Sequence, residues 1–384
     1  MSDPLPPLSL YVHLPWCEQK CPYCDFNSHA LRQTLPENDY ATALLSDLES
    51  AAQQVGDRVL CSVFFGGGTP SLFSAQSIAA VLESAHTLIG LADGAEVTLE
   101  ANPGSADAAR FAAYRSAGVN RLSLGLQSFS DPQLKALGRI HNADQSRGAV
   151  IAARDAGFEK INIDLMHGLP DQSMIEATHD IESAIAFSPE HLSLYQLTIE
   201  PNTRFAADPP TLPDEETCWQ IRCILEERAA DAGYERYEVS AFSRRGNRCR
   251  HNLNYWEFGD YIGIGAGAHS KITDGPRIWR CAREKHPRRY IETAFAEKRP
   301  PQFQSVSGSA LSFEFALNAL RLKEGFTVAL FEQRTGLSWD GLSSTIAEAQ
   351  ERGLLKVSTH RVCATPLGYR FLDDLVELFL PASD

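Results

Sequence analysis

The chain has 384 residues, more than a single hydrophobic core usually serves, so we expect one large domain and one smaller domain. Hydrophobic residues make up 43% of the chain and charged residues 22%, which is typical of an ordinary soluble globular protein. The formal net charge of −14 disfavours nucleic acid as a partner, because phosphate contact needs concentrated lysine and arginine.

The N-terminal segment, MSDPLPPLSL, has no basic stretch followed by a long apolar run, and no segment of the chain approaches the length of a membrane span. We therefore expect a cytoplasmic protein. We do not expect disulfides among its nine cysteines, because the cytoplasm is reducing. A cluster of cysteines in such a protein indicates metal binding or catalysis instead.

Apolar, β-rich runs recur along the first half of the chain, with helical patterns between them. The predicted strands cover residues 9–14, 61–67, 96–102, 121–128, 160–168 and 191–198. Strands that alternate with helices predict βαβ units and a parallel sheet, so the expected fold class is α/β. Between two of these strands, the segment 107–116 predicts a helix that ends near Gly118. Six units are enough for an open or partial barrel, whereas a closed eight-stranded barrel needs two more.

Two breaks interrupt the second half of the chain. The acidic, proline-rich segment 200–216 predicts a long surface loop, and the segment 298–309 predicts a linker. We expect the linker to separate a large domain, residues 1–297, from a small one, residues 310–384.

The sequence of the small domain predicts a winged-helix-like α+β module. Its predicted elements are a helix through Phe313, Leu317 and Leu320, a helix at 340–352, a hairpin of LLKVST with RVCATP, and a last helix through Phe371, Leu375 and Leu378. Acidic residues outnumber basic ones in this module, so we do not expect it to bind DNA.

Three cysteines, Cys17, Cys21 and Cys24, form a C-x3-C-x2-C motif in a segment that two prolines mark as a loop. Thiolates are ligands for zinc and for iron–sulfur clusters, and a short loop lets three of them converge on one centre. A closed zinc site needs a fourth ligand, from His13, His29 or elsewhere. A [4Fe–4S] cluster on three cysteines leaves one iron open, as chemistry at a metal requires. Both interpretations stay open on the spacing alone.

The segment FFGGGTPS, residues 64–71, follows a predicted strand, and its glycines let the backbone approach a ligand. The segment lacks the lysine of a phosphate-binding P-loop, so a nucleoside triphosphate is not its expected ligand. The alternative is a plain strand-to-helix turn in which Thr69 is the cap and Pro70 the first helical residue.

Polar residues end the other predicted strands, where the mouth of a barrel would place its chemistry. Glu100, Gln127 and Asp164 lie at or near strand ends, and Arg139 follows in a helical stretch. Taken singly, each is better explained as a solvated or capping residue.

A second dense motif, CRHNLNYWEFGDYIGIGAGAHS, covers residues 249–270. His251, Asn252, Tyr255 and Trp256 place an imidazole that can bind metal beside two large aromatic faces. The alternative is a packed turn in which the aromatics are core and the imidazole is satisfied by a hydrogen bond.

The cysteine motif, with Tyr23 before its last cysteine and a strand before its first, resembles the signature of the radical S-adenosylmethionine (radical SAM) superfamily. Nearly the whole chain is similar to the coproporphyrinogen oxidase-like branch of that superfamily. The resemblance implies a partial (β/α)6 barrel and a [4Fe–4S] cluster on the three cysteines. It also implies SAM on the open iron, where reduction of the cluster cleaves SAM to a 5′-deoxyadenosyl radical. The SAM contacts that the resemblance implies are Tyr11, Tyr23, Gly67, Gly68, Thr69, Glu100, Gln127, Arg139, Asp164, Thr198 and His269.

The H-N-x-x-Y-W motif at His251 resembles the one tied to heme binding in the heme chaperones of this branch. That resemblance implies heme as cargo, with His251 as an axial ligand and Tyr255 or Trp256 packed on the porphyrin. It also implies acceptor hemoproteins as partners, among them membrane respiratory enzymes, and a possible homodimer.

Two alternatives to a heme chaperone remain, one an enzyme and the other a structural protein. The first is an oxygen-independent coproporphyrinogen III oxidase, in which a radical step decarboxylates the propionates. Against it, Phe26 stands where the oxidases have a further cysteine, and the segment before Cys17 is shorter than theirs. The second is a structural protein whose fold is stabilised by a bound zinc ion.

Overall fold

The computed structural model describes residues 5–105, 107–295, 303–306, 308–359 and 361–381. Its largest feature is a twelve-stranded sheet in the order β14-β13-β12-β11-β1-β4-β5-β6-β7-β8-β10-β9. The strands of this sheet are β1 (Leu8–Leu14), β4 (Leu60–Gly67), β5 (Leu91–Ala101), β6 (Arg121–Gln127), β7 (Ile161–His167), β8 (His191–Gln196), β9 (Glu235–Arg236), β10 (Ala241–Ser243), β11 (Asp260–Ile264), β12 (His269–Asp274), β13 (Arg277–Ala282) and β14 (Phe303–Val306).

The six predicted strands are β1 and β4 to β8, and they lie side by side and parallel in chain order. This arrangement confirms the α/β class. A seventh parallel strand, β11, pairs with the other edge of β1 and was not expected. Antiparallel strands then extend the sheet on both sides. Because the strand order has two free ends, the sheet is open, and how far it closes toward a barrel stays a prediction.

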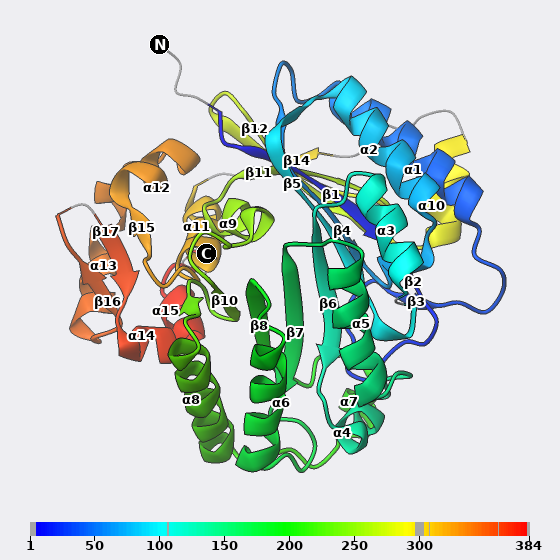
Figure 1. The fold of residues 1–384 in the computed structure, drawn as a ribbon. Coiled ribbons are helices and arrows are strands. Elements are labelled where there is room, and N and C mark those ends of the chain that lie inside the picture. Colours follow the sequence, from blue (N-terminus) through cyan, green and yellow to red (C-terminus); the bar gives the residue numbers. More distant parts are fainter. Residues whose placement is uncertain (1–4, 106, 296–302, 307, 360, 382–384) are drawn as a thin grey trace.

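Helices cover the outer face of the parallel strands (Figure 1). Outside the C-terminal part, the α-helices are α1 (Glu37–Ala52), α2 (Ala75–Leu88), α3 (Ala108–Ser116), α4 (Asp131–Ala136), α5 (Ala143–Asp155), α6 (Met174–Ala186), α7 (Arg204–Ala207), α8 (Glu215–Asp231), α9 (Arg250–Trp256) and α10 (Pro287–Phe295). The predicted helix at 107–116 is confirmed as α3, and the predicted loop 200–216 contains the short α7. No helix in the described part of the chain is long and apolar enough to cross a membrane.

Alternating side chains decide which face of the sheet each helix covers. On β5, Val97 and Leu99 point into the main hydrophobic core, which lies under the covering helices. Glu96 and Thr98, on the opposite face, contact His251 of α9 instead. Helix α9 therefore lies on the inner face of the sheet, against β1, β4 and β11. Local signals also set the helix starts, since Asn142 and Gln145 form a capping box at α5.

The C-terminal part has a three-stranded antiparallel sheet in the order β15-β17-β16. It packs around a second hydrophobic core, which also includes Phe258 and Ile278 of the preceding part. Its elements are α11 (Ser309–Ala319), β15 (Phe326–Thr327), α12 (Val328–Thr335), α13 (Ser343–Glu351), β16 (Leu355–Val357), β17 (Arg361–Ala364), α14 (Pro366–Arg370) and α15 (Leu372–Glu377). The predicted hairpin is confirmed as β16 with β17. The predicted last helix is confirmed as α15, which Phe371 and Leu378 flank as its N-terminal and C-terminal caps.

The predicted linker, 298–309, lies partly outside the described residues, at 298–302 and 307. Of its remaining residues, Phe303–Val306 form β14, which pairs with β13 at the edge of the large sheet. The limits of the two domains stay a prediction.

Candidate functional site

The carboxyl ends of the parallel strands meet at one edge of the sheet, because neighbouring parallel strands end together. The cysteine loop leaves the end of β1, and the glycine segment forms the end of β4 and the turn after it. Glu100 lies one residue before the end of β5, and Gln127 is the last residue of β6. The fold thus gathers most of the predicted site residues at this edge.

The cysteine loop is closed by two short parallel strands, β2 (Trp16–Cys17) and β3 (His29–Ala30). All three cysteines are half-buried free thiols, and the backbone N–H of Cys24 donates to the carbonyl of Cys21 at 3.2 Å. Burial raises the pKa of the Cys17 thiol, and the nearby sulfurs of Cys24 and Cys21 raise it further. The three thiols therefore lie near enough to influence one another, and their convergence on one cluster stays a prediction.

These thiols fit an iron–sulfur cluster better than a closed zinc site. The zinc interpretation needs a free fourth ligand, and both ring nitrogens of His13 are engaged. Nδ1 lies 2.8 Å from the hydroxyl of Tyr11, and Nε2 lies 2.9 Å from the carbonyl oxygen of Asn27. The other candidate, His29, has its Nε2 3.3 Å from the side-chain oxygen of Asn27. Three soft sulfur donors remain, as a cluster with one open iron requires.

The glycine segment packs directly on the cysteine loop. Gly67 has a φ of +118°, a left-handed conformation that glycine tolerates without strain. A Cβ atom on Gly68 would lie 2.5 Å from the carbonyl oxygen of Trp16, so only glycine fits there. Thr69 makes no side-chain cap at the short 3₁₀ helix Pro70–Leu72. Its hydroxyl instead accepts a hydrogen bond from Asn102 Nδ2 at 2.9 Å.

Two acidic side chains meet on the inner face of the sheet. Burial and the charge of Asp164 raise the pKa of Glu100 to about 8, while the N–H of Gly67 donates to Glu100 Oε2 at 3.2 Å. Burial also raises the pKa of Asp164, although hydrogen bonds from Asn162, Ser193 and Ser123 oppose that shift. A cationic ligand, such as the sulfonium of SAM, would relieve the repulsion between the two carboxylates.

Arg139 joins this edge to the cysteine loop. Its Nη1 donates to Cys21 Sγ at 3.6 Å, and its Nη2 donates at 2.8 Å to both Asn102 Oδ1 and the carbonyl of Gly125. A small cavity lies beside Cys21, Thr69, Asn102 and Arg139. Asn102 was not singled out from the sequence, although it follows β5 directly, as the other strand-end residues do.

The two tyrosines among the predicted SAM contacts also lie near this edge. The Tyr11 ring lies 5.7 Å from the Phe64 ring, and Tyr23 lies in the cysteine loop with its ring 6.4 Å from Phe205. By contrast, Thr198 and His269 are exposed. The Thr198 hydroxyl donates to Glu200 Oε1 at 2.9 Å, and His269 begins β12. Their assignment as SAM contacts stays a prediction.

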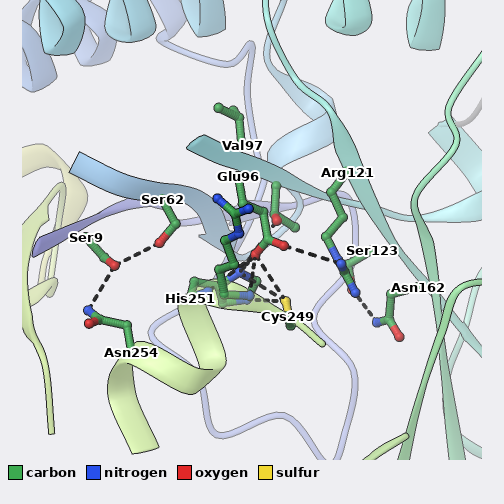
Figure 2. A network of polar contacts seen from close by, with 12 residues as sticks. Ser9, Ser62, Glu96, Val97, Arg121, Ser123, Asn162, Cys249, His251 and Asn254 are labelled. Atoms are coloured by element: carbon green, nitrogen blue, oxygen red, sulfur yellow. Dashed lines mark hydrogen bonds and ion pairs between the residues drawn. The ribbon is translucent and has the colours of Figure 1, made fainter. Parts of the chain in front are cut away.

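The predicted heme ligand His251 lies at the amino ends of the strands, on the other side of the inner face from the cysteine loop. Only 5% of His251 is exposed, and its Nδ1 lies 3.1 Å from Glu96 Oε1 and 3.2 Å from Cys249 Sγ (Figure 2). The ring stacks on Phe64 at a centroid distance of 4.2 Å. In this conformation the imidazole is satisfied by protein contacts, so its role as an axial ligand stays a prediction.

Glu96 anchors this end of α9. Its Oε1 accepts from the N–H of Arg250 at 2.8 Å and of His251 at 3.3 Å, and its Oε2 lies 3.3 Å from Arg121 Nη1. Burial opposes ionisation of Glu96, but the hydrogen bonds from His251 and the charge of Arg121 lower its pKa to about 2. The pairing of Glu96 with Arg121 could not be predicted from the sequence, because nothing near either residue distinguishes it from an ordinary charged surface residue.

The other residues of the H-N-x-x-Y-W motif are less buried. Asn252, Tyr255 and Trp256 are each partly exposed, and the Arg321 guanidinium lies 4.3 Å from the centre of the Trp256 ring. The Tyr255 ring packs edge-on against Tyr261 at 4.9 Å. These side chains form the accessible part of the motif.

Comparison with known proteins adds a second line of evidence. The radical SAM superfamily matches residues 11–181, and the HemN C-terminal domain matches residues 306–371. The heme chaperone HemW of Haemophilus influenzae is 48% identical over 383 residues, which cover 98% of each chain. HemW of Escherichia coli is 47% identical over 378 residues, which cover 98% of this chain and 99% of its own. HemW of Bacillus subtilis is 33% identical over 380 residues, which cover 97% of this chain and 99% of its own.

Among solved structures, coproporphyrinogen III oxidase HemN from Escherichia coli superimposes with a TM-score of 0.81. The match covers 98% of this chain and 90% of that chain at 22% sequence identity. An identity this low carries the fold and not the activity.

Proposed function

This chain belongs to the radical SAM superfamily, in the HemN-like branch that contains the HemW heme chaperones, and we propose that it binds heme and delivers it to acceptor hemoproteins. The observation that carries this proposal is an identity of 47–48% to two HemW proteins over almost the whole chain. Because the similarity includes both the cysteine loop and the α9 motif, it extends to both parts of the candidate site.

The proposal includes a [4Fe–4S] cluster on Cys17, Cys21 and Cys24, with SAM on its open iron. The cluster and SAM together supply one-electron chemistry when bound. The side chains support SAM binding by their charge: Arg139 suits a carboxylate, and Glu100 can accept hydrogen bonds from ribose hydroxyls. The glycine turn at Gly68 lets the ligand approach the backbone.

We further propose that heme binds at α9, with Tyr255 or Trp256 packed on the porphyrin and His251 as an axial ligand. Since Glu96 and Cys249 hold the imidazole in this structure, ligation requires His251 to turn out of its buried position. The acceptors we propose are membrane respiratory enzymes, reached from the cytoplasm. We also propose that the protein forms a homodimer.

A second candidate is the oxygen-independent coproporphyrinogen III oxidase, which the HemN fold favours. Phe26 argues against it, because the oxidases carry a further cysteine at that position. Phe26 is 61% exposed beside the proposed cluster. Anaerobic conversion of coproporphyrinogen III to protoporphyrinogen by the reconstituted protein would establish this candidate in place of the chaperone.

An anaerobic heme titration of the cluster-reconstituted protein, followed by absorption, tests heme binding at α9. We expect saturation near one heme per chain and an affinity that falls at least about tenfold in His251→Ala, because the variant lacks the axial imidazole. The matched control is His179→Ala, which removes an exposed histidine from α6 and should leave the affinity unchanged. Equal heme binding by wild type and His251→Ala would refute the assignment of His251.

A further inference from the structure

A chain of buried hydrogen bonds crosses the inner face of the sheet from α9 to Asp164. The N–H of Cys249, the residue before α9, donates to the Tyr237 hydroxyl at 3.3 Å. The hydroxyl lies 2.9 Å from His191 Nε2, and His191 Nδ1 lies 2.6 Å from Asn162 Oδ1. Asn162 Nδ2 then donates to Asp164 Oδ1 at 2.7 Å.

The donors in this chain all point the same way. Burial lowers the pKa of His191 well below its ordinary value, so the ring is neutral. Because an amide oxygen only accepts, His191 Nδ1 carries the proton and Nε2 accepts from the Tyr237 hydroxyl. Aligned donors strengthen one another in a buried chain, so a change at one end alters the bond at the other.

Asp164, at the end of this hydrogen-bond chain, accepts hydrogen bonds from two side chains. Besides Asn162, the Ser123 hydroxyl donates to Asp164 Oδ2 at 3.0 Å. Ser123 itself accepts from Asn162 Nδ2 at 2.8 Å (Figure 2). Both oxygens of Asp164 are therefore acceptors with fixed directions. Asn162 sets the orientation of this carboxylate.

We propose that Tyr237, His191 and Asn162 are positioning residues that couple α9 to Asp164, so that heme bound at α9 weakens SAM binding. This inference rests on the proposed function, which puts heme at α9 and SAM at Asp164. Linkage makes the effect reciprocal, and bound SAM weakens heme binding by the same factor.

The sign follows from what heme ligation requires. The chain is intact in this structure, in which His251 is held by Glu96 and Cys249. When His251 turns out to bind iron, the start of α9 must move, and the Cys249 N–H shifts away from Tyr237. Asp164 then loses part of its fixed orientation, and SAM loses affinity. Bound SAM correspondingly favours the conformation in which His251 stays buried.

The experiment measures SAM affinity of the cluster-reconstituted full chain with and without saturating heme, by equilibrium dialysis under anaerobic conditions. The test variant is Tyr237→Phe, which removes one oxygen from the chain and keeps the ring. The matched control is Tyr234→Phe, which also removes a buried hydroxyl close by. The Tyr234 hydroxyl donates to the carbonyl of Pro189 at 2.6 Å and takes no part in the hydrogen-bond chain from Cys249 to Asp164.

We expect heme to raise the SAM dissociation constant about fivefold or more in the wild type and in Tyr234→Phe. In Tyr237→Phe, we expect the change to fall below about twofold, with circular dichroism reporting the same fold. Full coupling in Tyr237→Phe would overturn the inference, as would a wild type that binds both ligands without coupling. A wild type that fails to bind heme or SAM would refute the proposed function itself.

Discussion

Replacement of Cys21 with alanine is expected to abolish the iron–sulfur cluster. Cys21 is the middle one of the three proposed ligands, and Arg139 Nη1 donates to its sulfur at 3.6 Å. A loop with two remaining thiols cannot hold a cluster that three of them share, and both candidate histidines are engaged in hydrogen bonds. We expect iron to fall from about four atoms per chain to below about one, with loss of the cluster absorbance at about 400 nm.

The matched control for this prediction is Cys223→Ala, which removes an exposed thiol from α8. Both variants are reconstituted without oxygen and analysed for iron and for absorbance. Cys223→Ala should keep the full iron content of the wild type. Unchanged iron in Cys21→Ala would disprove the ligand assignment, and one zinc per chain with no iron in the wild type would support the zinc-stapled alternative.

The second large effect is expected from Arg121→Met, which breaks a fully buried ion pair. The side chains of Arg121 and Glu96 are 1% and 2% exposed, and their closest atoms lie 3.3 Å apart. Without the guanidinium, the Glu96 carboxylate stays buried with an uncompensated charge. Loss of one partner from such a pair typically costs about 3–5 kcal/mol, so we expect the free energy of unfolding to fall by that amount in urea titrations.

A surface ion pair is the control for Arg121. Arg352 lies 3.7 Å from Glu348 on α13, and both side chains are about half exposed. Arg352→Met should change the free energy of unfolding by less than about 0.5 kcal/mol. A loss below about 1 kcal/mol in Arg121→Met would show that the Arg121–Glu96 pair does not anchor α9.

The regular part of the fold could be predicted because its signals are local. The six parallel strands and α3 each follow from a short apolar pattern and a glycine or polar end. Strand β11 was missed because its sequence, DYIGI, lies far along the chain from β1, and nothing local shows that they pair.

The site could be predicted in part. The cysteine motif lies within one loop, so its spacing already implies convergence, and strand ends in a parallel sheet meet whatever their separation in sequence. The burial of His251 could not be predicted, because it depends on Glu96 and Phe64, which come from β5 and β4. The hydrogen-bond chain through His191 was missed for the same reason: its members belong to separate strands.

The two parts of the candidate site lie toward opposite ends of the parallel strands. The cysteine loop lies at the carboxyl ends of the strands, whereas α9 lies at their amino ends, where Asn254 Nδ2 donates to Ser9 Oγ at 2.9 Å (Figure 2).

The most direct test of the chaperone account is heme transfer. The cluster-reconstituted protein is loaded with one heme per chain, freed of excess heme, and mixed anaerobically with an apo-hemoprotein that can be separated from it. The account predicts that heme moves to the acceptor and that the His251→Ala variant delivers less of it. Heme that stays on the donor, together with conversion of coproporphyrinogen III by the same preparation, would contradict the account and identify an oxidase.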